Sequence, residues 1–188
     1  HVVLHWMKGT GIDASPPRFD WNGTEVSAGW VTTFSELTVA SENRVTPISQ
    51  DIPMEAACLL GCAVTTGLGI VFNNAGLMPG QPIAVFWFGG GGLNVIQGAA
   101  LVNAYPIVAI DRYAHKLEQA RVFGATHTLD SSDCAVLDSL SDLTVGRGMD
   151  VTVDTTGNTQ VRQIVYKATS DKGKAIFCIL YNSQSPRE

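Results

Sequence analysis

Little in this sequence of 188 residues points to nucleic-acid binding, membrane insertion or secretion. The formal net charge is −5, so the chain lacks the basic excess that marks proteins that bind nucleic acid. Asn73, Asn74 and several glycines interrupt the longest apolar stretch, and we expect no run of the roughly 18 apolar residues that a membrane span needs. The first residues carry no signal-peptide pattern. We therefore predict a protein with neither nucleic acid nor membrane as a partner.

Cysteine is also scarce. The chain has only Cys58, Cys62, Cys134 and Cys178, which form no CxxC pair and no dense framework. Because such spacing is not that of a disulfide scaffold, free thiols in a reducing compartment are the expectation. We predict a cytoplasmic location.

The first 50 residues have the texture of β structure. Residues 2–6 and 31–39 are rich in Val, Thr, Phe and Trp and are predicted strands, and residues 9–29 between them are a predicted loop. Two strands in so short a segment cannot close a hydrophobic core. Residues 1–50 are therefore predicted to be part of a larger β domain.

From residue 51 to residue 188 the pattern alternates between helix and strand. A first helix is expected from about Ile52 toward Asn74, with a break allowed at Gly61 or Gly67. Predicted strands then cover residues 83–88, 106–110, 126–129, 149–154 and 174–180, and predicted helices cover residues 92–103, 114–123, 133–143 and 159–169. The alternation predicts a doubly wound α/β fold with a parallel Rossmann sheet. Since such a fold usually has a sixth strand, we expect the last strand to be missing.

A glycine-rich turn follows the first strand of this sheet. Four glycines, Gly89 to Gly92, lead into an apolar helix that begins near Leu93. Glycines let a phosphate approach the backbone, and the N–H groups at a helix N-terminus bind it. The turn predicts a pyrophosphate site formed by Gly89, Gly90, Gly92 and Leu93, and thus a dinucleotide-binding domain.

An acidic residue ends the second predicted strand of the sheet. Asp111 stands where an acid can accept both hydroxyls of an adenosine ribose, which favours NAD over NADP. Arg112 follows directly and leaves tolerance of NADP open. The alternative interpretation of Asp111 is an N-cap for the next helix.

One position departs from the dinucleotide fingerprint G-x-G-x-x-G. Trp87 occupies the place of the first glycine, whereas Gly89 and Gly92 supply the second and third. The first glycine makes the tight turn beside the dinucleotide, and an indole adds bulk there. Phe88 is also large, and Gly91 is an extra glycine that costs backbone entropy. Such a conflict between local sequence and function indicates a change of function or a redesign.

Several spaced motifs resemble one family, the zinc-dependent medium-chain alcohol dehydrogenases. Residues 60–69 are similar to its G-C-x-x-x-T-G-x-G helix, and residues 79–86 are similar to the approach to its nucleotide turn. Further agreement is found at Ile110-Asp111, Lys116, Gly124-Ala125-Thr126 and residues 149–157. Residues 1–50 resemble the later part of the family's GroES-like catalytic domain. The resemblance spans nearly the whole chain.

The resemblance implies a hydride transfer between a small alcohol or aldehyde and NAD, assisted by a catalytic zinc ion. It makes Cys62 a zinc ligand, although from the residues alone this cysteine could equally be a small buried hydrophobic residue. The other two protein ligands would precede His1, so we expect zinc to be absent or weakly bound. The resemblance places Thr66 near the nicotinamide and Lys116 on the adenosine side, where it could also be an ordinary solvated charge. We expect this chain by itself to be inactive.

The family usually has small residues after the last predicted strand, whereas this chain has Ile179, Leu180 and Tyr181. Together with Trp87 and Phe88 they would fill the cofactor cleft, unless that loop is misaligned. A redesigned, non-catalytic Rossmann scaffold for binding or assembly is therefore the alternative function, and a homo-oligomer is left open. A third interpretation is a zinc-free relative of the quinone-oxidoreductase type, but the presence of Cys62 within its motif disfavours it.

Overall fold

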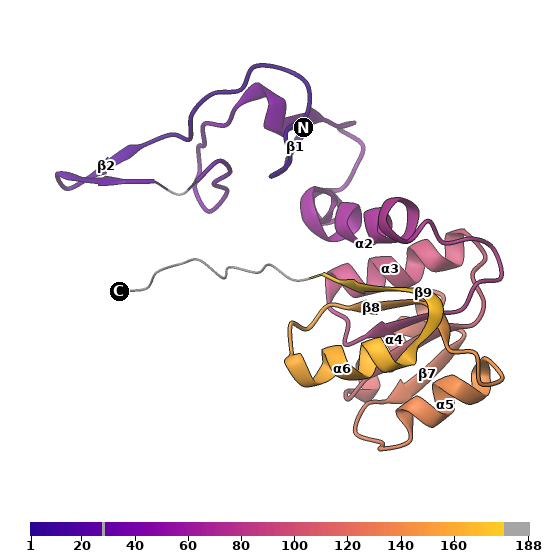
Figure 1. Ribbon diagram of the computed structural model, residues 1–188. Coiled ribbons are helices and arrows are strands. Elements are labelled where there is room, and N and C mark those ends of the chain that lie inside the picture. The colour runs from indigo at the N-terminus through magenta and orange to yellow at the C-terminus, as the bar shows by residue number, and fades with distance from the viewer. Residues whose placement is uncertain (28, 179–188) are drawn as a thin grey trace. The chain divides into compact units, whose positions relative to one another are not determined.

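The computed structural model describes residues 1–27 and 29–178. The chain divides into two compact units, His1–Cys62 and Ala63–Glu188. Figure 1 shows the first in indigo to purple and the second from purple to yellow. The division falls inside a helical run, about twelve residues after the point near residue 50 where the sequence changes from a strand-like to an alternating helix and strand pattern.

The His1–Cys62 unit contains little regular structure. Its strands form two antiparallel pairs, β1 (Val2–Leu4) with β4 (Val45–Pro47) and β2 (Phe19–Trp21) with β3 (Thr24–Val26). A short 3-10 helix, η1 (Glu42–Arg44), precedes β4. The one buried hydrophobic residue described in this unit is Ala57. The expectation that this segment closes no core of its own therefore agrees with the structure.

Two predictions for this unit were wrong. Residues 31–39 form no strand, because no segment within residues 1–27 and 29–178 pairs with them, and Phe34, Leu37 and Val39 remain exposed. The predicted loop 9–29 instead contains the β2–β3 hairpin. Asn22 and Gly23 both have positive φ angles, 53° and 80°, as a two-residue type I′ turn requires.

The predicted first helix is confirmed as a continuous helical run without a break at Gly61 or Gly67. It comprises α1 (Met54–Leu59), α2 (Thr65–Gly69) and the π-helical segments η2 (Leu60–Val64) and η3 (Ile70–Ala75). Gly76 ends it in the left-handed conformation. Its 22 residues include an 18-residue window of mean hydropathy 1.7, so the expectation that no segment is long and apolar enough for a membrane span was wrong. Helices in the cores of soluble proteins meet the same criterion.

The Ala63–Glu188 unit has the predicted doubly wound sheet. Its five strands are β5 (Ile83–Phe86), β6 (Ile107–Asp111), β7 (His127–Asp130), β8 (Met149–Asp154) and β9 (Thr169–Phe177). They are parallel and ordered β7-β6-β5-β8-β9. The connecting helices are α3 (Gly90–Leu101), α4 (Ala114–Val122), α5 (Val136–Leu143) and α6 (Thr159–Ala168).

Alternate residues of the central strand β5 face two separate cores. Ile83 and Val85 join the first core cluster, which includes residues of η3, α3 and α4. Ala84 and Phe86 join the second core cluster, with residues of α5 and α6. This two-residue period follows from the pleat of a strand that is covered on both faces. Figure 1 shows α2 and α3 on one side of the sheet and α6 on the other.

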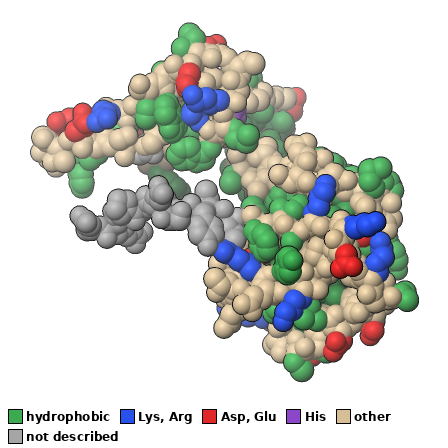
Figure 2. Space-filling model, viewed as in Figure 1, with side chains coloured by type: hydrophobic (Ala, Val, Ile, Leu, Met, Phe, Trp, Pro, Cys, Tyr) green, Lys and Arg blue, Asp and Glu red, His purple; other side chains and the backbone are tan. Residues whose placement is uncertain are grey.

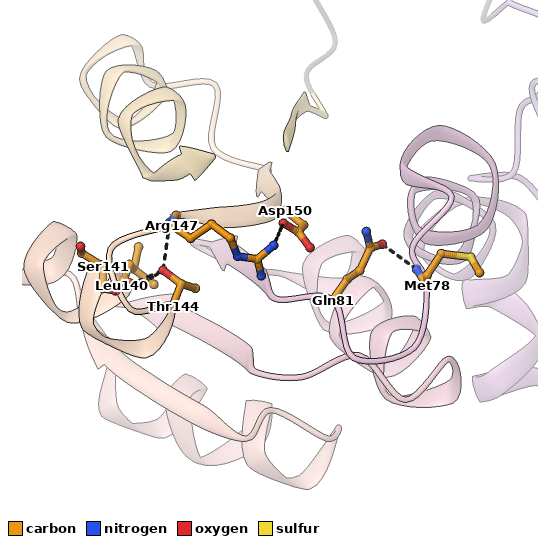
Figure 3. A network of polar contacts seen from close by, with 8 residues as sticks. Met78, Gln81, Leu140, Ser141, Thr144, Arg147 and Asp150 are labelled. Carbon is orange, nitrogen blue, oxygen red and sulfur yellow. Dashed lines mark hydrogen bonds and ion pairs between the residues drawn. The ribbon is translucent and has the colours of Figure 1, made fainter. Parts of the chain in front are cut away.

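A tight turn between α5 and β8 contains strained backbone. Thr144 donates its hydroxyl to the Leu140 carbonyl (3.0 Å) and accepts the Gly148 N–H (3.0 Å), and Arg147 pairs with Asp150 at 2.9 Å (Figure 3). Within this turn Val145 has a φ of 54° and is 95% exposed. A β-branched residue is disfavoured in this conformation by about 1–2 kcal/mol.

Replacing this valine with asparagine should therefore stabilise the fold. We expect Val145→Asn to raise the free energy of unfolding by about 1 kcal/mol, because asparagine tolerates the left-handed region. Urea denaturation followed by circular dichroism measures it. The matched control is Val122→Asn at an exposed helical valine of α4, where no gain is expected. A V145N variant no more stable than the parent would contradict the strain at this turn.

Candidate nucleotide-binding site

The strand order of the sheet creates a crevice at one place. The chain moves outward from β5 to β6 and β7, then returns to β8 on the other side of β5. Ligands of open α/β sheets bind beyond the carboxyl ends of the strands at such a switch point. Here those ends are Phe86 of β5 and Asp154 of β8, which are paired in register.

The turn that leaves β5 is held by hydrogen bonds on both sides of Trp87. The Trp87 N–H donates to the Ile110 carbonyl (2.7 Å), and its carbonyl accepts the hydroxyl of Thr155. Trp87 has a φ of 44°, a left-handed conformation that glycine adopts without strain. The position thus has the backbone of the fingerprint's first glycine, and a tryptophan there is strained by about 1–2 kcal/mol.

Phe88 does not fill the cleft, contrary to the sequence-based hypothesis. Its side chain is 1% exposed and belongs to the first core cluster. The position of Phe88 also shows why the third residue of the fingerprint must be a glycine, because a Cβ on Gly92 would collide with the Phe88 Cβ. Ile179, Leu180 and Tyr181 lie outside the described residues. Of the five bulky residues, the structure therefore places only Trp87 at the cleft.

Asp111 ends β6 and is completely buried, with 0% exposure. One carboxylate oxygen, Oδ2, accepts the N–H of Phe88 at 3.3 Å and lies 3.6 Å from Nζ of Lys116. The other, Oδ1, accepts the N–H of Tyr113 at 3.1 Å, in the turn that leads into α4. The carboxylate thus ties the end of β6 to the turn after β5. Its contact with a ribose stays a prediction.

The N-terminus of α3 faces open space. Gly89 is the N-cap and has no side chain to cap the helix, and the first helical bond runs from Leu93 N–H to the Gly89 carbonyl (3.0 Å). The N–H groups of the first turn have no partner inside a helix and carry partial positive charge. A Cβ added at Gly89 or at Gly91 would meet nothing within 4 Å. The backbone is therefore open at Gly89 and Gly91, although none of residues 89–93 lines a described pocket.

A pocket of about 500 Å³ adjoins the turn. Its lining comes from the segments after β5, β6, β7 and β8, namely Trp87, Arg112, Tyr113, Lys116, Ser131, Ser132, Thr156, Asn158 and Val161. Two of these residues are cations and, among the described residues, no carboxylate lines the pocket. The charge of Lys116 is partly offset by the buried Asp111 carboxylate 3.6 Å away, so Arg112 is the lining cation without a described carboxylate partner.

The ends of β7 and β8 carry carboxylates beside this pocket. Ser132 donates its hydroxyl (2.6 Å) and its N–H (2.8 Å) to Asp130, and these bonds hold the pKa of the exposed Asp130 carboxyl below its ordinary value. Asp154 is buried, and its Oδ1 accepts the N–H (2.7 Å) and hydroxyl (2.6 Å) of Thr156. Within the described part of the chain, Asp154 Oδ2 has no hydrogen-bond partner.

A comparison with known protein families shows which family this chain belongs to. Residues 90–185 match the family described as zinc-binding dehydrogenase. The chain belongs to the zinc-binding dehydrogenase family. The matched residues include α3 and most of the site that follows it.

Individual relatives agree with this assignment. The chain is 41% identical over 141 residues to an S-(hydroxymethyl)glutathione dehydrogenase of Saccharomyces cerevisiae, which covers 72% of this chain and 36% of the relative. It is 42% identical over 164 residues to a protein of that name from Escherichia coli, covering 85% of this chain and 44% of the relative. An alcohol dehydrogenase zinc-binding domain protein from Burkholderia ambifaria superposes with a TM-score of 0.69 at 29% identity, over 73% of this chain and 37% of that one. The chain thus spans less than half the length of these relatives.

The described residues do not fit a zinc ion. In residues 1–27 and 29–178, no group of three His, Cys, Asp or Glu side chains could hold a metal. Cys62 is exposed, and its role as a zinc ligand stays a prediction. Thr66 lies on α2 and is half-buried, but it does not line the pocket.

The structure brings together some of the predicted site residues and adds others. Arg112 and Lys116 line the pocket, whereas Asp111 lies buried beneath it. Sequence reasoning missed Ser131, Ser132, Thr156 and Asn158. The sequence could have indicated these four residues, because each follows the end of a predicted parallel strand, where this fold binds ligands.

Removing the Asp111 carboxylate should loosen the turn. We expect Asp111→Ala to lower the free energy of unfolding by about 2 kcal/mol, because the buried N–H of Phe88 and the partly buried N–H of Tyr113 lose their acceptor. Thermal unfolding followed by circular dichroism measures the change. The control is Glu118→Ala, which removes an exposed pair with Arg121 and should change stability by less than about 0.5 kcal/mol. Equal effects of D111A and E118A would show that the buried carboxylate does not hold the turn.

Proposed function

We propose that this chain is the nucleotide-binding part of an alcohol dehydrogenase that transfers a hydride between a small alcohol or aldehyde and NAD. The observation that carries the proposal is the open α3 N-terminus at the switch point of the sheet, next to a pocket that Arg112 and Lys116 line. The names of the yeast and E. coli relatives support a dehydrogenase acting on an alcohol. Cytoplasmic location remains part of the proposal.

The residues of this chain bind and orient the cofactor. The N–H groups of Gly89, Gly90 and Gly92 bind the pyrophosphate, and Leu93, whose N–H donates to the Gly89 carbonyl, closes the same turn. The position of Asp111 at the end of β6 supports NAD as the cofactor, and its buried carboxylate holds the turn after β5. Arg112 and Lys116 line the adenosine side.

This chain supplies few of the residues that the family places around the nicotinamide and the zinc ion. When bound, NAD supplies the nicotinamide that accepts the hydride. We place Thr66 near that ring and Cys62 as the one family zinc ligand present here. We propose that this chain binds the nucleotide, and its lack of dehydrogenase activity by itself stays a prediction.

A second candidate is a non-catalytic binding or assembly module. It is favoured by the His1–Cys62 unit, where Trp6, Met7, Phe34 and Leu37 are exposed by 61% to 105%. Large exposed apolar groups in one region indicate a surface that another protein covers. Nucleotide binding distinguishes the two candidates, since an assembly module needs none.

The experiment is a calorimetric titration of the chain with NAD, followed by a change at the α3 N-terminus. We expect saturable binding, and Gly91→Asp should weaken it at least about tenfold. The introduced carboxylate would accept the N–H groups that bind pyrophosphate and would repel its charge. Gly91 has space for a side chain and no left-handed backbone, so the fold should persist.

Gly91→Ala is the matched control, because it adds a Cβ without a charge. Its affinity for NAD should stay within about twofold of the parent. A chain without measurable NAD binding would contradict the proposed function. Equal binding by G91D and G91A would show that the pyrophosphate does not lie at the α3 N-terminus.

A further inference from the structure

The indole of Trp87 is the least expected feature of the pocket. Its backbone is pinned by Ile110 and Thr155, so the side chain projects from a fixed position. The side chain is half-buried rather than covered. A large aromatic group is thus held rigidly at the switch point of the sheet.

Trp87 packs partly against the core and partly lines the pocket. It packs against the second core cluster, and the ring of Phe86 lies 6.3 Å from it at an angle of 36°. The rest of its surface lines the pocket of about 500 Å³ and a neighbouring pocket of about 250 Å³, which also share Ser131 and Ser132. The indole therefore forms part of the wall of both spaces.

The other aromatic ring of the larger pocket already has cationic neighbours. Arg112 lies over the Tyr113 ring at 4.6 Å from its centroid, and Lys116 lies at 5.5 Å. Tyr113 is itself 43% exposed, so Trp87 and Tyr113 are the two aromatic residues that a ligand in this pocket can contact, and Trp87 is the one without a cation over its ring among the described contacts. An aromatic face with cations beside it suits a planar base that carries a phosphate.

We propose that Trp87 is a stacking surface for a purine base, and that the pocket beside it binds a purine nucleoside phosphate. The base lies against the indole, Arg112 and Lys116 lie on the adenosine side, and the phosphate lies toward the N-terminus of α3. This deepens the proposed function and rests on it, since the ligand is the adenosine half of the dinucleotide. The tryptophan at a position with glycine backbone geometry then adds a contact instead of blocking the cleft.

The test compares aromatic and aliphatic residues at this position, with AMP as the probe. In calorimetric titrations Trp87→Phe should bind AMP within about threefold of the parent, because a phenyl ring also stacks. Trp87→Leu should bind AMP at least about tenfold more weakly, because the side chain stays apolar but offers no ring. Adenosine and inorganic phosphate, titrated separately, should each bind more weakly than AMP.

Tryptophan fluorescence gives a second reading that needs no altered fold. AMP should quench the emission of the parent chain and of Trp21→Leu, a control in the β2–β3 hairpin, but not that of Trp87→Phe. Circular dichroism confirms that each variant is folded. Unfolding of W87L would leave the parent's fluorescence response to decide, and AMP binding without quenching would overturn the proposal.

The outcomes distinguish base stacking on Trp87 from the proposed binding of NAD, on which it rests. A chain that binds neither AMP nor NAD contradicts both. NAD binding that Trp87→Leu leaves unchanged contradicts stacking alone. A Trp87→Gly variant that binds AMP more tightly than the parent would show that the indole obstructs the pocket, which also overturns stacking.

Discussion

The buried carboxylate of Asp111 is the constraint on which the nucleotide-binding unit depends. A carboxylate away from water is costly unless it is hydrogen-bonded and paired, and this one accepts the N–H groups of Phe88 and Tyr113 beside the ammonium of Lys116. Those contacts fix the turn after β5 relative to the end of β6. They thereby fix where α3 begins and where the pocket opens.

The strain at Trp87 persists because its surroundings determine the backbone. Hydrogen bonds to Ile110 and Thr155 hold the turn, and Phe88 is anchored in the first core cluster. Gly92 lies too close to Phe88 to carry a Cβ. Strained backbone of this kind is found where function requires a fixed geometry, and here it presents an indole to the pocket.

The surface charge is consistent with a site for one small anion rather than a broad basic face. Figure 2 shows Lys and Arg side chains scattered singly over the visible face of the Ala63–Glu188 unit, with acidic groups and apolar groups between them. Arg112 and Lys116 differ from such scattered charges because they line a pocket that no described carboxylate lines.

Most of the sheet could be predicted from the sequence, because its strands are short apolar runs between helices. β8 has the predicted bounds, and α3 begins at Gly90, close to the predicted start. The His1–Cys62 unit was harder, since strand propensity at residues 31–39 has no effect without a pairing partner. The β2–β3 hairpin was missed although Asn22-Gly23 is a strong turn signal.

The sequence named two residues that line the pocket, but it did not give the orientation of their neighbours, and the cofactor role of these residues stays a prediction. The order of strand, glycines and acid located the turn, Arg112 and Lys116. That Asp111 faces the turn rather than the pocket, and that Phe88 faces the core, depends on tertiary packing that a linear pattern does not contain. The φ of Trp87 was implied by the fingerprint, yet only the structure shows its indole at the pocket wall.

Amide chemical shifts of the ¹⁵N-labelled chain, recorded during titration with NAD, test the central claim most directly. The account predicts that shifts concentrate at Gly89 to Gly92 and at the pocket residues Arg112, Lys116, Ser131 and Ser132. Shifts confined to the His1–Cys62 unit, or none at the glycine turn at saturating NAD, would contradict it.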